Sequence, residues 1–476
     1  MKELSMELKA DGAKPLYQQI YEYIRAEIIK QNIKQGEKLP STRFLSEYLE
    51  VSRSTVELAY DQLTSEGYIE AEPYRGFFVC DVTEVYDLRA ERMSEGQLQM
   101  SMKTNENHWE KHTKKYLYDF SPNGVDLSVF PFKTWSNITR TLLLDQGEEL
   151  FVSGEARGDL SFRCAIANYL HQARGVNCSP EQIIVGAGNE YLQMLLAQIL
   201  EGKFRIAMES PAYLPAYYTF RNLGFFVSPV ELDREGMRVD QLENSGADIA
   251  YVMPSHQFPT GTVMPMKRRL ELLAWAAGEP DRYIIEDDYD SEFRYRGKPI
   301  PSLQGSDRFG RVIYLGTFSR SIAPATRVSY MVLPLPLLEQ YKKACGFYAS
   351  TVPRLMQSTI FHFIQEGYFE RNLNKMRVIY KKRHELLIDY LKGCGWCDKI
   401  RGEHSGLHLL VQTNLNCTEQ EVIAKLAREG IRVYGLSEYN IGGKCLTQKP
   451  VLIFGFGGMK EDELMDGLKK TGKILH

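Results

Sequence analysis

The spacing of apolar residues near the start of the chain predicts three helices followed by two short strands. Apolar side chains recur every three or four positions from about Pro15 to Asn32, as they do on one face of a helix. Two shorter stretches with the same spacing follow, at Thr42–Leu49 and Arg53–Glu66. After them, Tyr68–Ala71 and Phe77–Val79 have the length and composition of paired strands.

Local signals mark where the second and third helices begin. Ser41 and Ser52 stand directly before them, and a serine hydroxyl at that position can accept a backbone N–H of the first turn. On the second helix we expect Phe44, Leu45 and Tyr48 to form the inner face. A helix, a helix–turn–helix and a hairpin in this order predict a winged helix-turn-helix fold.

A different pattern begins at Tyr118, where short apolar runs of strand length alternate with helical stretches. Buried strands separated by helices predict an α/β fold with a mostly parallel sheet. The polar stretch before Tyr118 has no sustained period, which predicts a flexible linker. The apolar runs are Ile183–Val185, Arg205–Met208, Phe225–Val227, Ile249–Met253, Tyr283–Ile285, Val312–Leu315 and Val328–Val332.

These patterns predict three parts along the chain. We expect a winged-helix domain at residues 12–82, a linker at 83–116 and a large domain at 117–476. Within the large domain, a smaller C-terminal α+β subdomain is expected at about 352–476. The length agrees with this division, because 476 residues exceed one ordinary domain.

Composition and charge exclude several classes of protein. Hydrophobic residues make up 43% and charged residues 25%, as in a soluble globular protein. The formal net charge is −3, and residues 1–83 carry roughly ten basic and fourteen acidic side chains, so any contact with DNA must come from a local patch. There is no apolar run of about eighteen residues and no signal-peptide segment, so we expect a cytoplasmic protein without membrane contact.

The eight cysteines do not form the pattern of a disulfide framework. One pair, Cys394 and Cys397, has C-x-x-C spacing, and His404 and His408 follow. A zinc or redox site is one interpretation and a reduced surface loop is the other. A second C-x-x-C pair is missing, so we predict no metal site.

The first part resembles the DNA-binding domain of GntR-type regulators. The resemblance is carried by PLYQQI at 15–20, LPSTR at 39–43, VSRSTV at 51–56, LxxEGY at 63–68 and RGFFV at 75–79. It implies that the third helix enters the major groove and that the hairpin forms the wing. Hydroxyl groups at a helix start suit phosphate, and arginine suits phosphate or guanine, although each arginine alone could be an ordinary surface residue. The predicted DNA-contacting residues are Arg43, Ser52, Arg53, Ser54, Thr55, Arg75 and Gly76.

The large part resembles fold-type I aminotransferases, and most closely the MocR-type regulators that join this fold to a GntR winged helix. The resemblance is carried by an apolar strand that ends in EDDYD at 286–290 and by GTFSRSIAPATR at 316–327. It implies a site for pyridoxal 5′-phosphate (PLP). It also implies a homodimer, because aminotransferase sites form between two subunits. The cofactor-site residues carried over are Gly188, Asn189, Tyr213, Asp287, Tyr289, Thr317, Ser319, Arg320 and Arg327.

The resemblance implies a role for each part of this set. Asp287 would pair with the pyridine nitrogen and Tyr289 with the phenolic oxygen, while Tyr213 would lie near the ring. A phosphate would be held by hydroxyl groups, by Arg327 and by the helix start at Gly188 and Asn189. The loop before Gly261 makes His256 and Gln257 weaker candidates.

Arg320 departs from the aminotransferase pattern, because it occupies the position of the lysine that forms a Schiff base with PLP. An arginine stays protonated and offers no free amine. Pro215 and Gly457 stand where a MocR-type relative has arginines that hold a substrate carboxylate. An engineered substitution is another explanation of Arg320, but the two missing arginines favour a site that is naturally non-catalytic.

We therefore expect a transcription regulator that binds a double-stranded DNA operator and senses a small effector. The effector predicted is PLP or a related vitamer, bound without a covalent bond. One alternative is a PLP-dependent transaminase that carries a DNA-binding domain. Another is a scaffold with a vestigial pocket whose ligand is a second protein.

Overall fold

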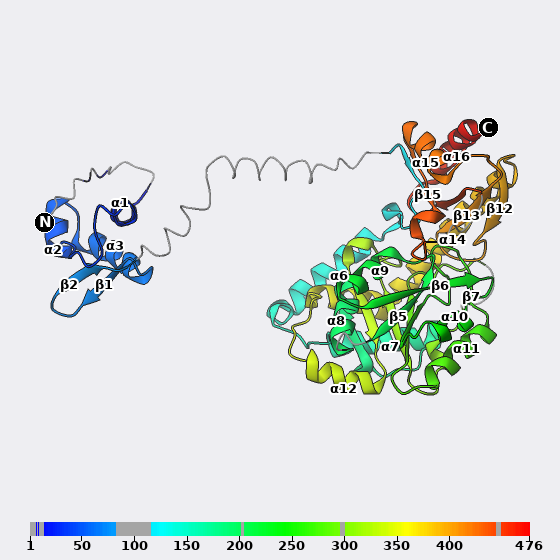
Figure 1. Cartoon of the computed structure of the whole chain (residues 1–476), viewed down its shortest axis with the longest axis horizontal. Helices are drawn as coiled ribbons and strands as arrows, with labels where there is room; N and C mark the ends of the chain where they lie inside the picture. The colour runs from blue at the N-terminus through cyan, green and yellow to red at the C-terminus, as the bar shows by residue number, and fades with distance from the viewer. Residues whose placement is uncertain are drawn as a thin grey trace. The chain divides into compact units, whose positions relative to one another are not determined.

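The computed structural model describes residues 6, 8, 14–81, 116–200, 204–295, 300–443 and 449–476. The chain forms two compact units, Met1–Lys114 and Lys115–His476, each with its own core (Figure 1). The predicted linker at 83–116 lies outside the described residues except for its last position.

The first unit is a winged helix-turn-helix, as the sequence predicts. Its helices are α1 (Leu16–Ile29), α2 (Thr42–Tyr48) and α3 (Arg53–Ser65), and its antiparallel hairpin pairs β1 (Ile69–Glu72) with β2 (Gly76–Val79). Both predicted caps are confirmed, because the Ser41 hydroxyl accepts the N–H of Phe44 and the Ser52 hydroxyl that of Thr55, each at 3.2 Å. The core is made by Ile20, Tyr21, Ile24, Ile28, Ile33, Leu39, Leu45, Val56, Ala59, Tyr60, Leu63, Tyr68, Ile69 and Val79.

The predicted inner face of α2 is wrong at two of its three positions. Leu45 is buried, but the side chains of Phe44 and Tyr48 are 54% and 49% exposed. These two rings lie one helical turn apart and stack on each other, with centroids 6.4 Å apart. The short helix is rotated so that Leu45 and Ser46 face the core, which leaves the neighbouring Phe44–Tyr48 stripe outside.

The second unit is built on an eight-stranded, mostly parallel sheet, as expected. The strand order is β4-β11-β10-β9-β8-β5-β6-β7, and β11 and the edge strand β7 run in the direction opposite to the other six strands. The strands are β4 (Ile183–Gly186), β5 (Arg205–Ser210), β6 (Phe226–Asp233), β7 (Gly236–Met237), β8 (Ile249–Val252), β9 (Tyr283–Asp288), β10 (Val312–Thr317) and β11 (Ser329–Val332).

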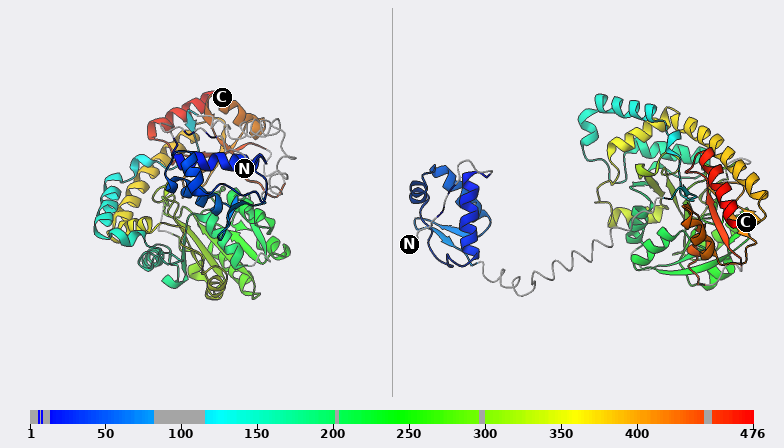
Figure 2. Two further views of the ribbon diagram at one scale, coloured as in Figure 1. Left: turned by 90° about the vertical axis from the view of Figure 1, so that its left-hand side faces the viewer. Right: turned by 90° about the horizontal axis from the view of Figure 1, so that it is seen from above.

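Helices cover both faces of this sheet, which explains why its strands are almost continuously apolar (Figure 2). Alternate residues of a strand point to opposite faces, so Ile184 packs with α8, α9 and α12, whereas Ile183 and Val185 pack with α6, α7 and α13. On the latter side, α10 and α11 cover the strands nearer β7. These helices are α6 (Phe132–Asp145), α7 (Leu160–Arg174), α8 (Asn189–Ile199), α9 (Leu214–Asn222), α10 (Val239–Asn244), α11 (Met266–Ala277), α12 (Leu335–Ala344) and α13 (Arg354–Gln365).

The C-terminal part forms a smaller α+β layer. Its antiparallel sheet has the order β12-β13-β16-β15 and packs with α14, α15 and α16 around a separate core. The strands are β12 (Cys397–Arg401), β13 (His408–Thr413), β15 (Tyr434–Gly435) and β16 (Val451–Gly455), and the helices are α14 (Tyr368–Lys392), α15 (Glu419–Arg428) and α16 (Glu461–Leu475).

The beginning of the second unit is attached to this C-terminal layer. Strand β3 (Tyr118–Asp119) pairs in parallel with β14 (Ile431–Arg432). The Phe120 N–H then donates to the carbonyl of Arg432 at 3.0 Å, and the Gly455 N–H donates to the carbonyl of Phe120 at 2.9 Å. The residues that follow the connector are thus fixed on the small sheet, and this placement brings the next few residues to the candidate site.

In the described ranges, no helix combines the length and apolar character needed to cross a membrane. No group of three or more histidine, cysteine, aspartate or glutamate side chains in the same ranges is placed to hold a metal ion. One ring nitrogen of His408 instead hydrogen-bonds the carbonyl of Pro259 at 2.9 Å.

Candidate functional site

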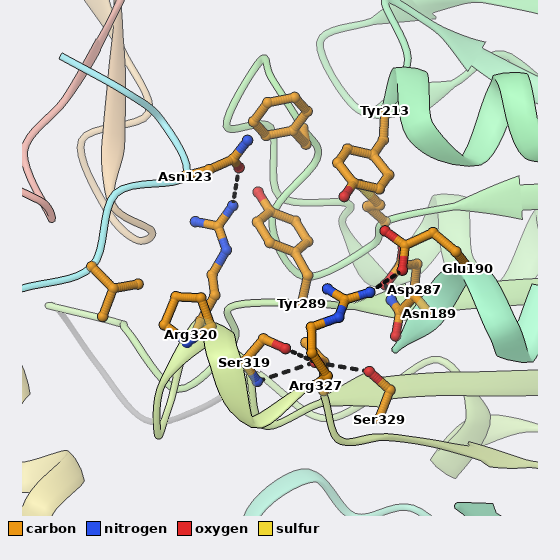
Figure 3. A pocket seen from close by; sticks show the side chains of 15 residues that line it. Asn123, Asn189, Glu190, Tyr213, Asp287, Tyr289, Ser319, Arg320, Arg327 and Ser329 are labelled. Atoms are coloured by element: carbon orange, nitrogen blue, oxygen red, sulfur yellow. Dashed lines mark hydrogen bonds and ion pairs between the residues drawn. The ribbon is translucent and has the colours of Figure 1, made fainter. Parts of the chain in front are cut away.

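A cavity of about 230 Å³ lies at the carboxyl ends of β9 and β10, beside the start of α8 (Figure 3). In open α/β sheets this is the edge at which ligands bind. Eight of the nine predicted cofactor-site residues line the cavity; the ninth, Gly188, immediately precedes Asn189. The full lining is Asn123, Val125, Asn189, Glu190, Tyr213, Met253, Phe258, Asp287, Tyr289, Thr317, Ser319, Arg320, Pro324, Arg327 and Ser329.

Asp287 is the buried carboxylate of the cavity. Its Oδ1 accepts a hydrogen bond from Nδ2 of Asn189 at 3.3 Å, and its Oδ2 accepts one from the Tyr251 hydroxyl. Burial raises the pKa of Asp287 to about 7, although the hydrogen bond from Tyr251 opposes the shift. A cationic N–H donor next to Asp287 would stabilise the ionised carboxylate, because the two side chains that hydrogen-bond it are neutral.

Tyr289 stands beside Asp287 and is held from behind by His256. The Nδ1 atom of His256 lies 2.9 Å from the Tyr289 hydroxyl and 3.0 Å from Oδ2 of Asp290. Burial tends to raise the pKa of Asp290, but the neighbouring His256 outweighs this effect and the pKa is lowered. His256 therefore contacts the cavity only through Tyr289, and the other weaker candidate, Gln257, donates to the backbone carbonyls of Pro211 and Phe258.

Arg320 lines the cavity beside Tyr289 and points toward Asn123 (Figure 3). Its guanidinium carbon lies 4.9 Å from the centre of the Tyr289 ring, in the geometry of a cation–π contact. Its Nη1 donates to the carbonyl of Pro122 at 3.0 Å and its Nη2 to Oδ1 of Asn123 at 2.5 Å. We call residues 121–125, which follow the segment fixed on the small sheet, the strap. Arg320 thus joins the large sheet to the strap.

The opposite end of the cavity contains the start of α8 and Arg327. The Nη2 of Arg327 donates to Oε2 of Glu190 at 2.6 Å. Gly188 has a φ of 101° and lies so close to this guanidinium that a Cβ atom would collide with it, so glycine is required here. The Thr317 and Ser319 hydroxyl groups are 3.1 Å apart. Backbone N–H groups, hydroxyl groups and a guanidinium together form a site suited to an anion.

Two positions at which the resemblance predicts carboxylate-binding arginines are occupied by Pro215 and Gly457. Pro215 lies in the first turn of α9. Gly457 packs so closely on the strap that a Cβ atom would collide with the carbonyl oxygen of Gly124. A side chain at 457 would therefore require the strap to move.

Seven lining residues were not predicted from the sequence. Glu190 follows Asn189 directly, so the same motif could have indicated it. Asn123 and Val125 are almost two hundred residues from Arg320, and no local pattern connects them. The other missed residues are Met253, Phe258, Pro324 and Ser329.

The predicted DNA-contacting residues lie on the first unit, at the start of α3, on α2 and at the tip of the hairpin. The Ser52 hydroxyl is 2.9 Å from that of Ser54 and 2.7 Å from that of Thr55. Arg53 and Arg43 are exposed, and each pairs with a glutamate four residues further along its helix. Exposed pairs of this kind contribute about 0–1 kcal/mol, so the arginines can leave them at little cost. Arg75 pairs with Glu72 at the turn of the wing, next to Gly76.

A winged helix followed by an aminotransferase fold defines a class of protein in which a DNA-binding domain is joined to an enzyme-like domain. Comparison with protein families agrees with both assignments. Residues 16–79 match the bacterial regulatory proteins of the gntR family, and residues 127–447 match aminotransferase class I and II.

Regulators from several bacteria are similar to the chain over almost its whole length. The uncharacterized HTH-type transcriptional regulator YdeL of Bacillus subtilis is 39% identical, covering 96% of both chains. The probable rhizopine catabolism regulatory protein MocR of Rhizobium meliloti is 34% identical, covering 97% of this chain and 94% of its own. The HTH-type pyridoxine biosynthesis transcriptional regulator PdxR of Corynebacterium glutamicum is 31% identical, covering 94% and 93%.

Solved aminotransferase structures share the fold. Kynurenine aminotransferase of Pyrococcus horikoshii superposes with a TM-score of 0.66 at 21% identity, covering 83% of this chain and 98% of that one. The chain therefore belongs to the MocR-type family of GntR regulators, which carry an aminotransferase class I and II domain. It is a DNA-binding transcription regulator with an aminotransferase-like domain.

Glu209, on β5, is a buried carboxyl group linked to the cavity wall. It accepts the N–H of Met253, a lining residue, at 3.4 Å. Burial raises the pKa of Glu209 to about 8, against the opposing hydrogen bonds from Met253 and Gln257. In the unfolded chain the group ionises near 4.5. Unfolding therefore releases a proton between these two pH values, and this group's contribution to stability falls as the pH rises through that window.

Replacing Glu209 by glutamine should remove this pH dependence, because the amide cannot ionise. One pKa unit corresponds to about 1.4 kcal/mol, so between pH 5 and pH 9 the free energy of unfolding of Glu209→Gln should gain a few kcal/mol relative to the wild type. Urea unfolding at a series of pH values measures this difference, with the exposed Glu243→Gln as control. Parallel curves for wild type and Glu209→Gln would contradict the interpretation.

Proposed function

We propose that the cavity binds PLP or a related vitamer without a covalent bond and that this binding regulates the affinity for DNA. The observation that carries the proposal is that Arg320 lines the cavity, at the position to which the resemblance to aminotransferases assigns the Schiff-base lysine. PLP supplies an electron sink to enzymes that link it covalently to a substrate. A guanidinium cannot form that link, so in this chain the same cavity would hold a ligand without transforming it.

The fit of the lining to a vitamer supports the proposal. Asp287 would accept a pyridine N–H, and the Tyr289 hydroxyl would contact a ring oxygen. Tyr213 packs edge-on against Phe258, with ring centroids 5.7 Å apart, and supplies an aromatic wall. The hydroxyl groups and Arg327 at the other end would hold a phosphate. We place no catalytic residue in this site.

The strap offers a route from the cavity to the connector. A ligand that lies on the Tyr289 ring would compete with Arg320 for that face. Loss of this contact would weaken the hold of Arg320 on Pro122 and Asn123, a few residues after the connector ends. Ligand binding would then change how the strap is held, and a resulting change in DNA affinity would be coupling between two distinct sites.

We also propose that the protein acts as a homodimer. On the second unit, Phe132, Leu144 and Phe151 are 64%, 74% and 78% exposed on α6 and the following turn. Large apolar side chains exposed on successive segments support a protein–protein interface on this part of the unit. Two winged helices brought together in this way would match an operator with two half-sites.

Calorimetric titration of PLP or pyridoxal into the cofactor-free protein should show saturable binding. Borohydride treatment of the complex should leave no mass adduct on the chain, because no lysine amine is available at position 320. The Arg320→Lys variant is the matched control and should gain the adduct. An adduct on the wild type would indicate a covalent site elsewhere. If neither vitamer gives a heat of binding or stabilises the protein against unfolding, the alternative of a scaffold with a vestigial pocket is favoured.

The second test addresses the DNA-binding unit. Fluorescence anisotropy with DNA from the region upstream of the protein's own gene should show tight, sequence-dependent binding by the wild type. Arg53→Ala should weaken it roughly tenfold and reduce the dependence of log affinity on log salt by about one unit if the residue meets a phosphate. Arg238→Ala, which removes an exposed paired arginine from the second unit, should have no effect. Equal affinity in the two variants would contradict the proposed interface.

A further inference from the structure

The charged groups of the cavity are balanced in pairs or by neutral partners. Two arginines and two acids line it. Arg320 is held by neutral oxygens and an aromatic ring, and Asp287 by a phenol and an amide. Arg327 and Glu190 are the two charged lining groups that bond each other, at 2.6 Å. The positive charge at the anion-binding end of the cavity is therefore already neutralised by the chain itself.

Glu190 occupies the place that an anionic group of a ligand would take. It lies in the first turn of α8, where the helix favours negative charge, and its carboxylate is held on Arg327 close to the backbone of Gly188. A phosphate approaching this end would meet the same guanidinium and the same helix start. It must either displace the carboxylate or share the arginine with a like charge a few ångströms away.

The pair does not have the character of a structural ion pair. The side chains of Arg327 and Glu190 are 53% and 44% exposed, so solvent screens them and their contribution to stability is small. By contrast, Arg174 and Asp288 form a buried pair at 2.7 Å with side chains 3% and 2% exposed. Glu190 is thus free to influence ligands without being needed for the fold.

We infer that Glu190 is a specificity-determining residue: it lowers the affinity of the cavity for phosphorylated vitamers relative to unphosphorylated ones. The inference rests on the proposed function, because it assumes that the pyridine ring enters beside Asp287 and Tyr289. An unphosphorylated vitamer places no anion at Arg327 and therefore does not compete with Glu190. A phosphorylated vitamer would gain hydrogen bonds from the hydroxyl groups of Thr317 and Ser319. Its phosphate would, however, meet the carboxylate of Glu190, which is bonded to Arg327.

Binding of PLP and of pyridoxal should be measured by calorimetry for the wild type and for Glu190→Gln. Glutamine keeps the shape of the side chain and removes its charge, so the affinity for PLP should rise about tenfold. The affinity for pyridoxal should stay within about twofold, because pyridoxal has no phosphate to meet residue 190. Glu339→Gln, at an exposed glutamate paired with Lys342, is the matched control and should change neither value. An unchanged ratio of the two affinities in Glu190→Gln would overturn the inference while leaving the proposed function intact.

A second measurement does not depend on binding of the vitamer's pyridine ring. Inorganic phosphate should raise the melting temperature of Glu190→Gln more than that of the wild type. In the double variant Glu190→Gln/Arg327→Ala this additional rise should disappear. If neither vitamer binds and the phosphate effect appears, the proposed function fails and the role of Glu190 stands. If phosphate stabilises both proteins equally, Glu190 does not control the anion-binding end.

Discussion

A row of buried carboxylates at the end of β9 is the constraint on which the candidate site depends. Burying a charge is costly unless it is paired, and the structure supplies partners to the acids in turn. Glu286 accepts two backbone N–H groups at 2.8 Å, Asp288 pairs with Arg174, and Asp290 pairs with His256. Asp287 differs because it lines the cavity, and the two side chains that hydrogen-bond it, those of Tyr251 and Asn189, are neutral. This difference makes Asp287 the residue to which a cationic ring nitrogen would bind.

An arginine at position 320, where the resemblance to aminotransferases predicts a lysine, would change what the same fold can do. A primary amine in this place would react with an aldehyde, whereas a guanidinium can only donate hydrogen bonds and stack on a ring. Arg320 does both, since it contacts Tyr289 on one side and the strap on the other. Under the proposed function, the scaffold would keep the residues that recognise a vitamer and lack the group that reacts with it, while Arg320 links the cavity to the strap.

The sequence predicted most of the fold and about half of the site. The caps at Ser41 and Ser52 and the strands of the large sheet follow from local patterns, which the structure confirms. The misassigned Phe44 and Tyr48 show the limit of such patterns, because on a helix of two turns the apolar stripe alone does not decide which side meets the core. The contact between Asn123 and Arg320 depends on how β3 docks onto the small sheet, and no periodicity within either segment records it.

The central claim is that occupancy of the cavity changes DNA affinity, and one measurement tests it directly. Anisotropy titrations with labelled upstream DNA should be made without ligand and with a vitamer at saturating concentration, for the wild type and for Asp287→Ala. Coupling between sites is usually worth about 1–3 kcal/mol, so the dissociation constant for DNA should change by at least about fivefold in the wild type and remain unchanged in the variant. An identical dissociation constant for the wild type with and without bound vitamer would contradict the account.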